Sequence, residues 1–326
     1  MTSAPLGPFH HSFMPRYTPE QLIDAFYGPP PKPNEKKLED LRQRVKKPER
    51  PKAELDLTLA RELLGKDVFG PEEVERVFEI NLDPDKVPPI PYSREQLEKA
   101  RELGEMLVLR VDKTDSGEPL TAQKLNDLLQ PKFTAAGKGK ILANVDWYQN
   151  EPFFIADTPR LEWKLVSKNI FSNPDGTPAV NLNYLHQTKL LRDRLKPIGA
   201  LSPGEEAECP DALLESLSAK MGVDWTSQQI VDQKKYSANW EPVAKKLANL
   251  QINQNHRRKI VEAMYDTLLA FETNDERLLP NIYEWTNTRS AGGDLVGFGC
   301  FDSDGDHVSD WRPDDRTADL GLVSSR

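Results

Sequence analysis

Cysteine is scarce in this sequence, since the 326 residues include only Cys209 and Cys300. Two cysteines cannot supply a disulfide framework, a cysteine-based zinc ribbon or an iron–sulfur site held by this chain alone. The five histidines are scattered at spacings that match no metal-ligand set. Walker loops, nucleophile elbows and His-Glu-x-x-His motifs are also missing. We therefore expect a protein that is not an enzyme and holds no cofactor.

Long apolar runs are missing as well. No stretch of about 18 apolar residues occurs, and the mean hydropathy is -0.64, so the sequence predicts no membrane-spanning helix. The first residues lack the apolar core of a secretory signal, and a cytoplasmic location is the expectation. The formal net charge of -9 argues against a chain that coats nucleic acid as a whole.

One segment reverses that charge balance. Ten of the 27 prolines fall within the first 51 residues, and Lys32–Lys52 holds nine basic and four acidic side chains. We predict that residues 1–53 form a disordered, proline-rich and basic tail with one short helix after Thr18. That helix either packs on the rest of the chain or docks on a partner. Nucleic acid, if it binds at all, would bind at Lys32–Lys52.

The remaining chain is predicted in two parts. Residues 54–104 form a helical segment, with a capping box at Ser93-Arg94-Glu95-Gln96. Residues 105–326 form an α+β domain, which contains a helical insertion at about 195–275. In the domain, the apolar run 106–111 and the alternating run 161–166 are typical of strands.

Three shorter patterns complete this reading. A helix beginning at Thr121 is predicted to stop before Pro131. The aromatic residues of 145–170 indicate core, with ligand stacking as the alternative. The basic run His256 to Lys259 is either the solvated start of a core helix or a phosphate site.

The C-terminal residues differ from everything before them. Trp285–Arg326 is rich in glycine and poor in helix-forming runs, so loops and short strands are expected. From Asp294 onward there are eight acidic and three basic side chains. A functional site, if one exists, should lie here.

One motif in this region suggests calcium. Asp302, Asp304, Asp306 and Asp310 stand at relative positions 1, 3, 5 and 9, the spacing of aspartate-rich calcium loops. The motif resembles thrombospondin type 3 and dockerin repeats. It departs from them because His307 replaces the turn glycine and only one copy is present. A calcium-binding structural module is therefore the alternative function, and a solvent-exposed acidic loop is the simpler reading.

A longer pattern in the same residues carries a second resemblance. It runs from Gly293-Asp294-Leu295-Val296 through Trp311-Arg312-Pro313-Asp314-Asp315-Arg316 to Leu320-Gly321-Leu322 and Ser325-Arg326. This resembles the end of the C-type-lectin-like fold in its formylglycine-generating-enzyme form. More narrowly, it resembles the variable proteins of diversity-generating retroelements. Formylglycine-generating activity does not carry over, because that chemistry needs a cysteine pair and only Cys300 is present.

The resemblance implies a β-rich, lectin-like domain whose first and last strands pair. The Met106 or Trp163 strand should then lie beside the Leu320–Val323 strand. It also implies a variable region in which a reverse transcriptase rewrites adenines within an unchanged scaffold. The apolar residues would hold that scaffold: Leu295, Val296, Phe298, Phe301, Val308, Trp311, Leu320 and Leu322.

The small and polar residues between them would form the variable, ligand-binding face. They are Gly299, Cys300, Asp302, Asp304, Asp306, His307, Ser309, Asp310, Asp314, Asp315, Thr317 and Asp319. The function expected from this pattern is non-enzymatic binding of a protein or surface ligand, which the sequence does not identify.

Overall fold

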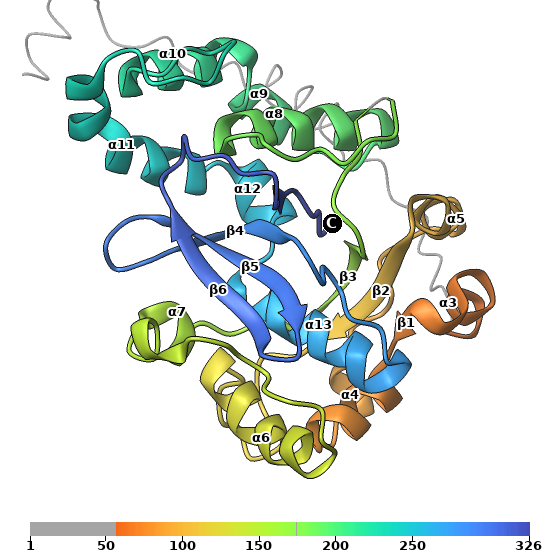
Figure 1. Cartoon of the computed structure of the whole chain (residues 1–326). Coiled ribbons are helices and arrows are strands. Elements are labelled where there is room, and N and C mark those ends of the chain that lie inside the picture. The colour runs from red at the N-terminus through yellow and green to blue at the C-terminus, as the bar shows by residue number, and fades with distance from the viewer. Residues whose placement is uncertain (1–56, 174) are drawn as a thin grey trace, which may run out of the picture. The chain divides into compact units, whose positions relative to one another are not determined.

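The computed structural model describes residues 57–173 and 175–326 (Figure 1). The predicted tail, its short helix and the basic segment Lys32–Lys52 lie outside the described residues. Glu54–Arg326 forms one compact unit. Residues 57–104 are therefore part of the same body as the described residues from 105 onward.

The first part of that unit alternates helices with three short strands. Its elements are α3 (Leu57–Leu64), β1 (Val68–Phe69), α4 (Pro71–Phe78), α5 (Arg94–Leu103), β2 (Glu105–Arg110), α6 (Ala122–Ala135), α7 (Pro152–Ile155) and β3 (Glu162–Ser167). Short 3-10 turns cover Gly65–Asp67, Pro84–Lys86 and Val145–Trp147.

A run of six helices and four strands makes up the remainder of the described chain. These are α8 (Tyr184–Leu195), α9 (Pro203–Glu208), α10 (Asp211–Met221), α11 (Gln233–Ala248), α12 (Gln251–His256), α13 (Ile260–Asn274), β4 (Tyr283–Arg289), β5 (Leu295–Asp302), β6 (Gly305–Trp311) and β7 (Leu320–Gly321). A further 3-10 turn, Lys196–Ile198, follows α8.

Two sheets organise the strands. The smaller has the order β1-β2-β3, with β1 parallel and β3 antiparallel to β2. The larger has the order β6-β5-β4-β7, in which β4 pairs antiparallel with β5 and parallel with β7. The structure is thus mixed α and β, as the sequence predicted.

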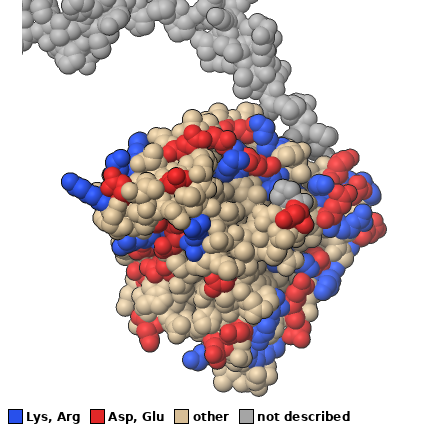
Figure 2. All heavy atoms as spheres, turned by 45° about the horizontal axis from the view of Figure 1, so that its top comes forward, with Lys and Arg blue, Asp and Glu red and all other residues tan. Residues whose placement is uncertain are grey.

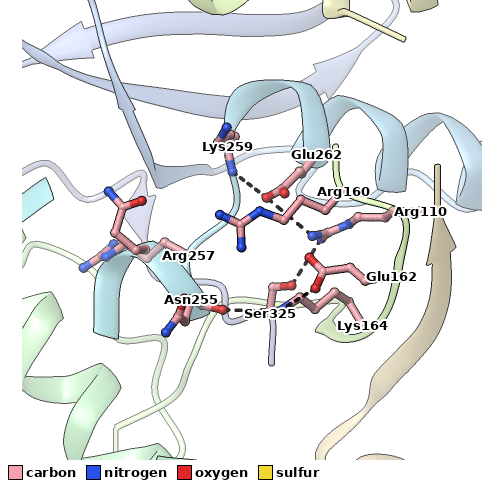
Figure 3. Close-up of a pocket in the computed structure, with 10 residues that line it drawn as sticks. Arg110, Arg160, Glu162, Lys164, Asn255, Arg257, Lys259, Glu262 and Ser325 are labelled. Carbon is pink, nitrogen blue, oxygen red and sulfur yellow. Dashed lines mark hydrogen bonds and ion pairs between the residues drawn. The ribbon is translucent and has the colours of Figure 1, made fainter. Parts of the chain in front are cut away.

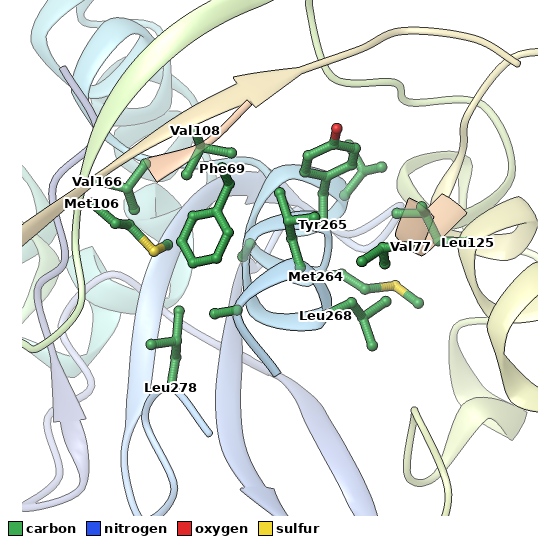
Figure 4. Close-up of a cluster of buried hydrophobic side chains, with 14 of the residues drawn as sticks. Phe69, Val77, Met106, Val108, Leu125, Val166, Met264, Tyr265, Leu268 and Leu278 are labelled. Atoms are coloured by element: carbon green, nitrogen blue, oxygen red, sulfur yellow. The ribbon is translucent and has the colours of Figure 1, made fainter. Parts of the chain in front are cut away.

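Helix α13 is the centre of the first hydrophobic core. It packs against β2 of the small sheet and against β4 and β5 of the large sheet. Its apolar side chains, among them Met264, Tyr265 and Leu268, meet Phe69 and Val108 in a buried cluster (Figure 4). The periodic apolar residues of this segment predicted such a core helix, and the structure confirms it.

A second core lies on the opposite face of the large sheet. Helices α8 to α12 form it, together with Trp285 and Leu295 from the sheet (Figure 1). The Trp285 and Tyr184 rings meet edge to face with centroids 5.4 Å apart. The helical insertion therefore covers part of this sheet face, and it begins at α8, whereas α13 belongs to the first core.

Buried charges connect the two sheets through α13. Asp266 accepts hydrogen bonds from the Arg110 Nε and Nη2 atoms at 3.0 and 2.6 Å, and from Arg258 Nη1 at 3.1 Å. Arg258 in turn pairs with Glu284 on β4. All four side chains are fully buried, so each charge depends on its partner.

The chain end returns to the small sheet. Leu165 and Arg326 exchange backbone hydrogen bonds of 3.0 and 2.9 Å, and Ser167 N donates to Ser324 O at 2.9 Å. Residues 324–326, rather than Leu320–Val323, therefore lie beside the Trp163 strand. Leu320–Gly321 instead forms β7 next to β4.

Several local expectations were wrong. Helix α6 continues through Pro131 to Ala135, because Leu129 and Phe133 on either side of the proline are both fully buried. The C-terminal residues form loops and strands, and three of these strands, with seven or eight residues each, are longer than the short strands expected. Arg257 and Arg258 are not part of a solvated helix start, since they are 2% and 0% exposed.

The surface carries charges of both signs. On the face shown in Figure 2, lysine and arginine side chains are interspersed with aspartate and glutamate. Among the described helices, none has the length and apolar character needed to cross a membrane.

Candidate binding face

The hairpin of β5 and β6 determines which C-terminal side chains can reach a ligand. Residues paired directly across antiparallel strands point to the same face of a sheet. Gly299 pairs with His307, and Gly297 pairs with Ser309. On the neighbouring strand, Tyr283 pairs with Gly299. His307, Ser309 and Tyr283 therefore project from one face, with two glycines between them.

We call this surface the outer sheet face and define it by Tyr283, Cys300, His307, Ser309 and Trp311. All five side chains are half-buried. It adjoins the part of the sheet that the second core covers, because Tyr283 and Trp311 also pack against that core.

The two glycines allow neighbouring groups to pack closely against the backbone in the middle of this face. A Cβ atom on Gly297 would lie 2.4 Å from the Trp311 ring, so the ring rests directly on the backbone there. Gly299 has φ +145, and a Cβ atom would lie 2.2 Å from the Ile282 carbonyl oxygen. Neither position tolerates a side chain without movement of its neighbours.

An aromatic pair borders these glycines. The rings of Tyr283 and Trp311 meet edge to face with centroids 5.1 Å apart. The Tyr283 hydroxyl lies within hydrogen-bonding reach of the Cys300 thiol, and Asp319 and Asp302 are close by. Burial, and then these neighbouring groups, raise the pKa of Tyr283 to about 12. Burial likewise raises the pKa of Cys300 to about 11, so its thiol stays protonated at neutral pH.

The structure brings some of the twelve predicted face residues together. Cys300, His307 and Ser309 belong to the outer sheet face, and Asp302, Asp304 and Asp319 are exposed at its edge. Asp302 and Asp304 flank the hairpin turn, where Asp302 Oδ1 accepts a hydrogen bond of 2.7 Å from Asp304 N.

Three of the twelve are buried and cannot contact a ligand. Gly299 is enclosed by backbone, as described above. Asp306 is 0% exposed because, in a strand, it points to the face opposite its neighbour His307 and enters the first core. Asp314 is 7% exposed and lies against Tyr236 of α11, and burial raises its pKa.

The other three are separate from the outer sheet face. Asp310 pairs with Val296 and so projects from the opposite side of the sheet, where it is exposed. Asp315 and Thr317 lie in the loop after β6, where Asp315 accepts a hydrogen bond from Arg312 N at 2.9 Å. The Thr317 carbonyl accepts another from Asn181 N at 2.9 Å, which attaches this loop to the start of α8.

The aspartate spacing does not produce a calcium loop. Asp306 lies in β6 and is buried, whereas Asp302 and Asp304 are exposed at the hairpin turn before it. Within the described part of the chain, no three histidine, cysteine, aspartate or glutamate side chains are grouped to hold a metal ion. His307 Nε2 lies 3.8 Å from Asp302 Oδ2, and Asp306 is not part of this contact.

The eight apolar scaffold residues were predicted more accurately than the twelve residues of the variable face. Seven of the eight are buried, which leaves Trp311 as the half-buried exception. Its partner Tyr283 was not predicted as a surface residue, because it lies before the glycine-rich segment Trp285–Arg326. The alternation of Tyr283 with the buried Glu284 was the available signal.

The aromatic residues of 145–170 are largely core, as expected. Tyr148, Phe153, Phe154 and Trp163 are buried, and only Trp147 reaches the surface, at 40% exposure.

Searches of protein-family models, curated proteins and solved structures find no match to this chain.

Proposed function

We propose that this chain is a non-enzymatic binding protein whose ligand contacts the outer sheet face. The observation that carries the proposal is the pairing of Gly299 with His307 and of Gly297 with Ser309. This pairing directs Tyr283, His307 and Ser309 to one face, where half-buried aromatic and polar side chains surround two buried glycines. Such a surface offers both large contact area and adaptable hydrogen bonding.

Separation of scaffold from contact residues supports the proposal. On β5 and β6, residues directed inward belong to the first core, whereas Cys300, His307 and Ser309 project outward. Substitutions at exposed positions usually change stability by less than about 0.5 kcal/mol. The ligand specificity of this face can therefore change while the fold is retained.

We further propose that the face belongs to a lectin-like domain varied by a retroelement. Residues 324–326 return to β3, which brings the C-terminal residues beside an early strand, although the last strand, β7, pairs with β4. The proposed variable positions are now Cys300, Asp302, Asp304, His307, Ser309 and Asp319. Gly299, Asp306 and Asp314 are withdrawn because they are buried.

A combined variant tests the tolerance of the face. Asp302→Asn, His307→Tyr and Ser309→Asn together should lower the free energy of unfolding by no more than about 1.5 kcal/mol. The matched control, Gly299→Asn with Asp314→Tyr, should destabilise the protein by several times that amount. Equal losses in urea denaturation would contradict the assignment of this face.

Binding capacity needs its own test. A display library varied at the six proposed positions should yield binders to an immobilised protein such as streptavidin, while a library varied at six exposed positions of α10 and α11 should not.

The nucleotide sequence of the locus tests whether a retroelement diversifies the gene. Adenine-rich codons at these positions, a near-copy of the 3′ end and an adjacent reverse transcriptase gene are expected, and their absence would remove diversification from the proposal.

A further inference from the structure

A small enclosed cavity lies where β3, the start of α13 and the C-terminal residues meet (Figure 3). Its volume is about 30 Å³. Seven of its lining residues are charged, and five of these are cationic: Arg110, Arg160, Lys164, Arg257 and Lys259. They come from distant parts of the sequence, so only the tertiary structure assembles this cluster.

Two of the five cations already have fixed partners. Arg110 is fully buried at the cavity, where Asp266 balances its charge and Ser325 Oγ accepts a bond of 3.2 Å. The guanidinium of Arg257 stacks 4.0 Å above the Tyr184 ring and donates to Asn253. Arg110 needs no ligand to explain its position, whereas the buried Nη2 atom of Arg257 has no hydrogen-bond partner among the described residues.

The other three cations are poorly compensated. Arg160 is exposed and has no hydrogen-bonding or ionic partner within the described residues. Lys164 Nζ lies 3.8 Å from Glu162 and 3.5 Å from the Asn255 carbonyl oxygen. Lys259 Nζ lies 3.9 Å from Asp157. These distances are at the limit of an ion pair.

The two glutamates that line the cavity, Glu162 and Glu262, already have partners. Glu262 accepts from the Lys259 backbone N at 2.9 Å and pairs with Arg110 at 3.4 Å. Among the described residues, Glu162 is left as the one carboxylate within 4 Å of Lys164. Burial, together with the charges of Arg110 and Arg160, lowers the pKa of Lys164, whereas Glu162 and Glu262 act in the opposite direction. Positive charge at this cavity is therefore in excess.

We propose that the cavity binds a phosphate or sulfate group through Arg160, Lys164 and Lys259. A volume of about 30 Å³ admits one or two oxygen atoms but no sugar or base, so the anion would insert only its terminal oxygens. Arg160, which is exposed, would contact the part that remains outside. A dianion fits three weakly paired cations better than the single charge of a carboxylate does.

This site is independent of the proposed binding function. Its residues come from β2, β3 and the start of α13, whereas the outer sheet face is built from β4, β5 and β6. Failure of one proposal would leave the other unchanged.

Calorimetric titration of the full chain with inorganic phosphate tests the site directly. We expect saturable binding of one phosphate per chain, similar binding of sulfate, and a rise in melting temperature beyond that produced by chloride at equal ionic strength. Acetate should bind at least about tenfold more weakly, because it carries one charge rather than two. An equal effect of chloride would overturn the proposal.

Substitutions of the proposed contact residues test where the anion binds. Arg160→Gln and Lys259→Gln should each weaken phosphate binding by about tenfold, a change of about 1.4 kcal/mol. Both side chains are outside the buried network, so the variants should fold normally. Lys189→Gln, on the surface of α8, is the matched control and should bind as the unaltered protein does. Unchanged affinity in the first two variants would refute the assignment.

The source of the anion is tested by comparing O-phosphoserine with inorganic phosphate. Tighter binding of O-phosphoserine would favour a phosphorylated molecule, because contacts at the exposed Arg160 would add to those inside. Tighter binding of inorganic phosphate would favour the free ion. If neither binds, the proposal is refuted.

Discussion

Asp306 shows how the direction of one side chain in a strand can determine its chemistry. It is fully buried, and neither carboxyl oxygen has a hydrogen-bond partner among the described residues. Burial raises its pKa well above the ordinary value near 4. The folded protein therefore holds a proton that the unfolded chain releases, and stability should fall as pH rises from about 4 toward the raised pKa.

Asp306→Asn removes this titration while it preserves shape. The variant should be more stable than the unaltered protein at pH 8, and the difference should shrink toward pH 5. Titration of Asp306 should change the free energy of unfolding by up to about 1.4 kcal/mol for each pH unit. Urea denaturation at both pH values measures it. Asp304→Asn, at the exposed hairpin turn, is the control, and an identical pH dependence in both variants would refute the burial argument.

Glu205 has the opposite behaviour, since its partners favour the charged form. It is 4% exposed, and its carboxylate accepts hydrogen bonds from Ser202 N at 2.7 Å, Asn255 Nδ2 at 2.9 Å and, as oriented here, His256 Nε2 at 3.1 Å. Burial opposes ionisation, but these bonds outweigh it and lower the pKa to about 2. The resulting stability is complete above the unfolded pKa near 4.5 and is lost as pH falls toward 2.

Glu205→Gln should therefore destabilise the protein by up to about 3 kcal/mol at pH 7, with a smaller effect below pH 4. Thermal unfolding across that range measures the difference. Glu206→Gln provides the control, because its ion pair with Lys196 is at the surface and should contribute less than about 1 kcal/mol. A loss in Glu205→Gln that does not change with pH would mean that the charge is not responsible.

At the scale of elements, the β5–β6 hairpin depends on Trp311. Its ring covers Gly297 and meets Tyr283, so one side chain of β6 contacts both β5 and β4 of the large sheet. Trp311→Ala should cost about 2 to 3 kcal/mol, less than the 3 to 5 kcal/mol of a fully buried tryptophan, because the ring is half-buried. Guanidinium denaturation is the measurement.

Trp147→Ala is the matched comparison, since that ring is 40% exposed and donates one bond of 3.2 Å to the Val308 carbonyl oxygen. Its loss should be smaller than that of Trp311→Ala. A cost below about 1 kcal/mol for Trp311→Ala would make Trp311 a ligand-contacting residue without a structural role.

At the scale of the whole molecule, α13 and its ion pairs unite the two sheets. Asp266→Asn would leave the buried guanidinium groups of Arg110 and Arg258 without their shared carboxylate, at a cost of about 3 to 5 kcal/mol. Because both sheets pack on α13, the loss should appear as one cooperative transition shifted to lower denaturant.

Asp193→Asn, which breaks a surface contact with Lys189, is the control and should change stability by less than about 1 kcal/mol. Amide hydrogen exchange of β2 and β4 extends the test. Faster exchange in both strands is expected for Asp266→Asn, and faster exchange in only one would mean that the network does not couple the sheets.

Local sequence patterns were sufficient wherever neighbouring residues supply the interaction. Ser93 Oγ accepts from Gln96 N at 3.3 Å, and Ser93 N donates to Gln96 Oε1 at 2.9 Å, which forms the expected capping box. Helix α5 then ends at Gly104, whose φ of +67 suits glycine. The periodic apolar residues of α13 identified a core helix for the same reason.

Other features depended on contacts between residues far apart in the sequence. Arginine is usually a surface residue, yet Arg258 is buried. Its charge is balanced by Glu284, 26 positions later, and by Asp266. Helix α6 passes through Pro131 because burial of Leu129 and Phe133 offsets the lost hydrogen bond. Asp304 and Asp306 look equivalent in sequence, but Asp304 lies in the exposed hairpin turn, whereas Asp306 lies in β6 and points into the first core.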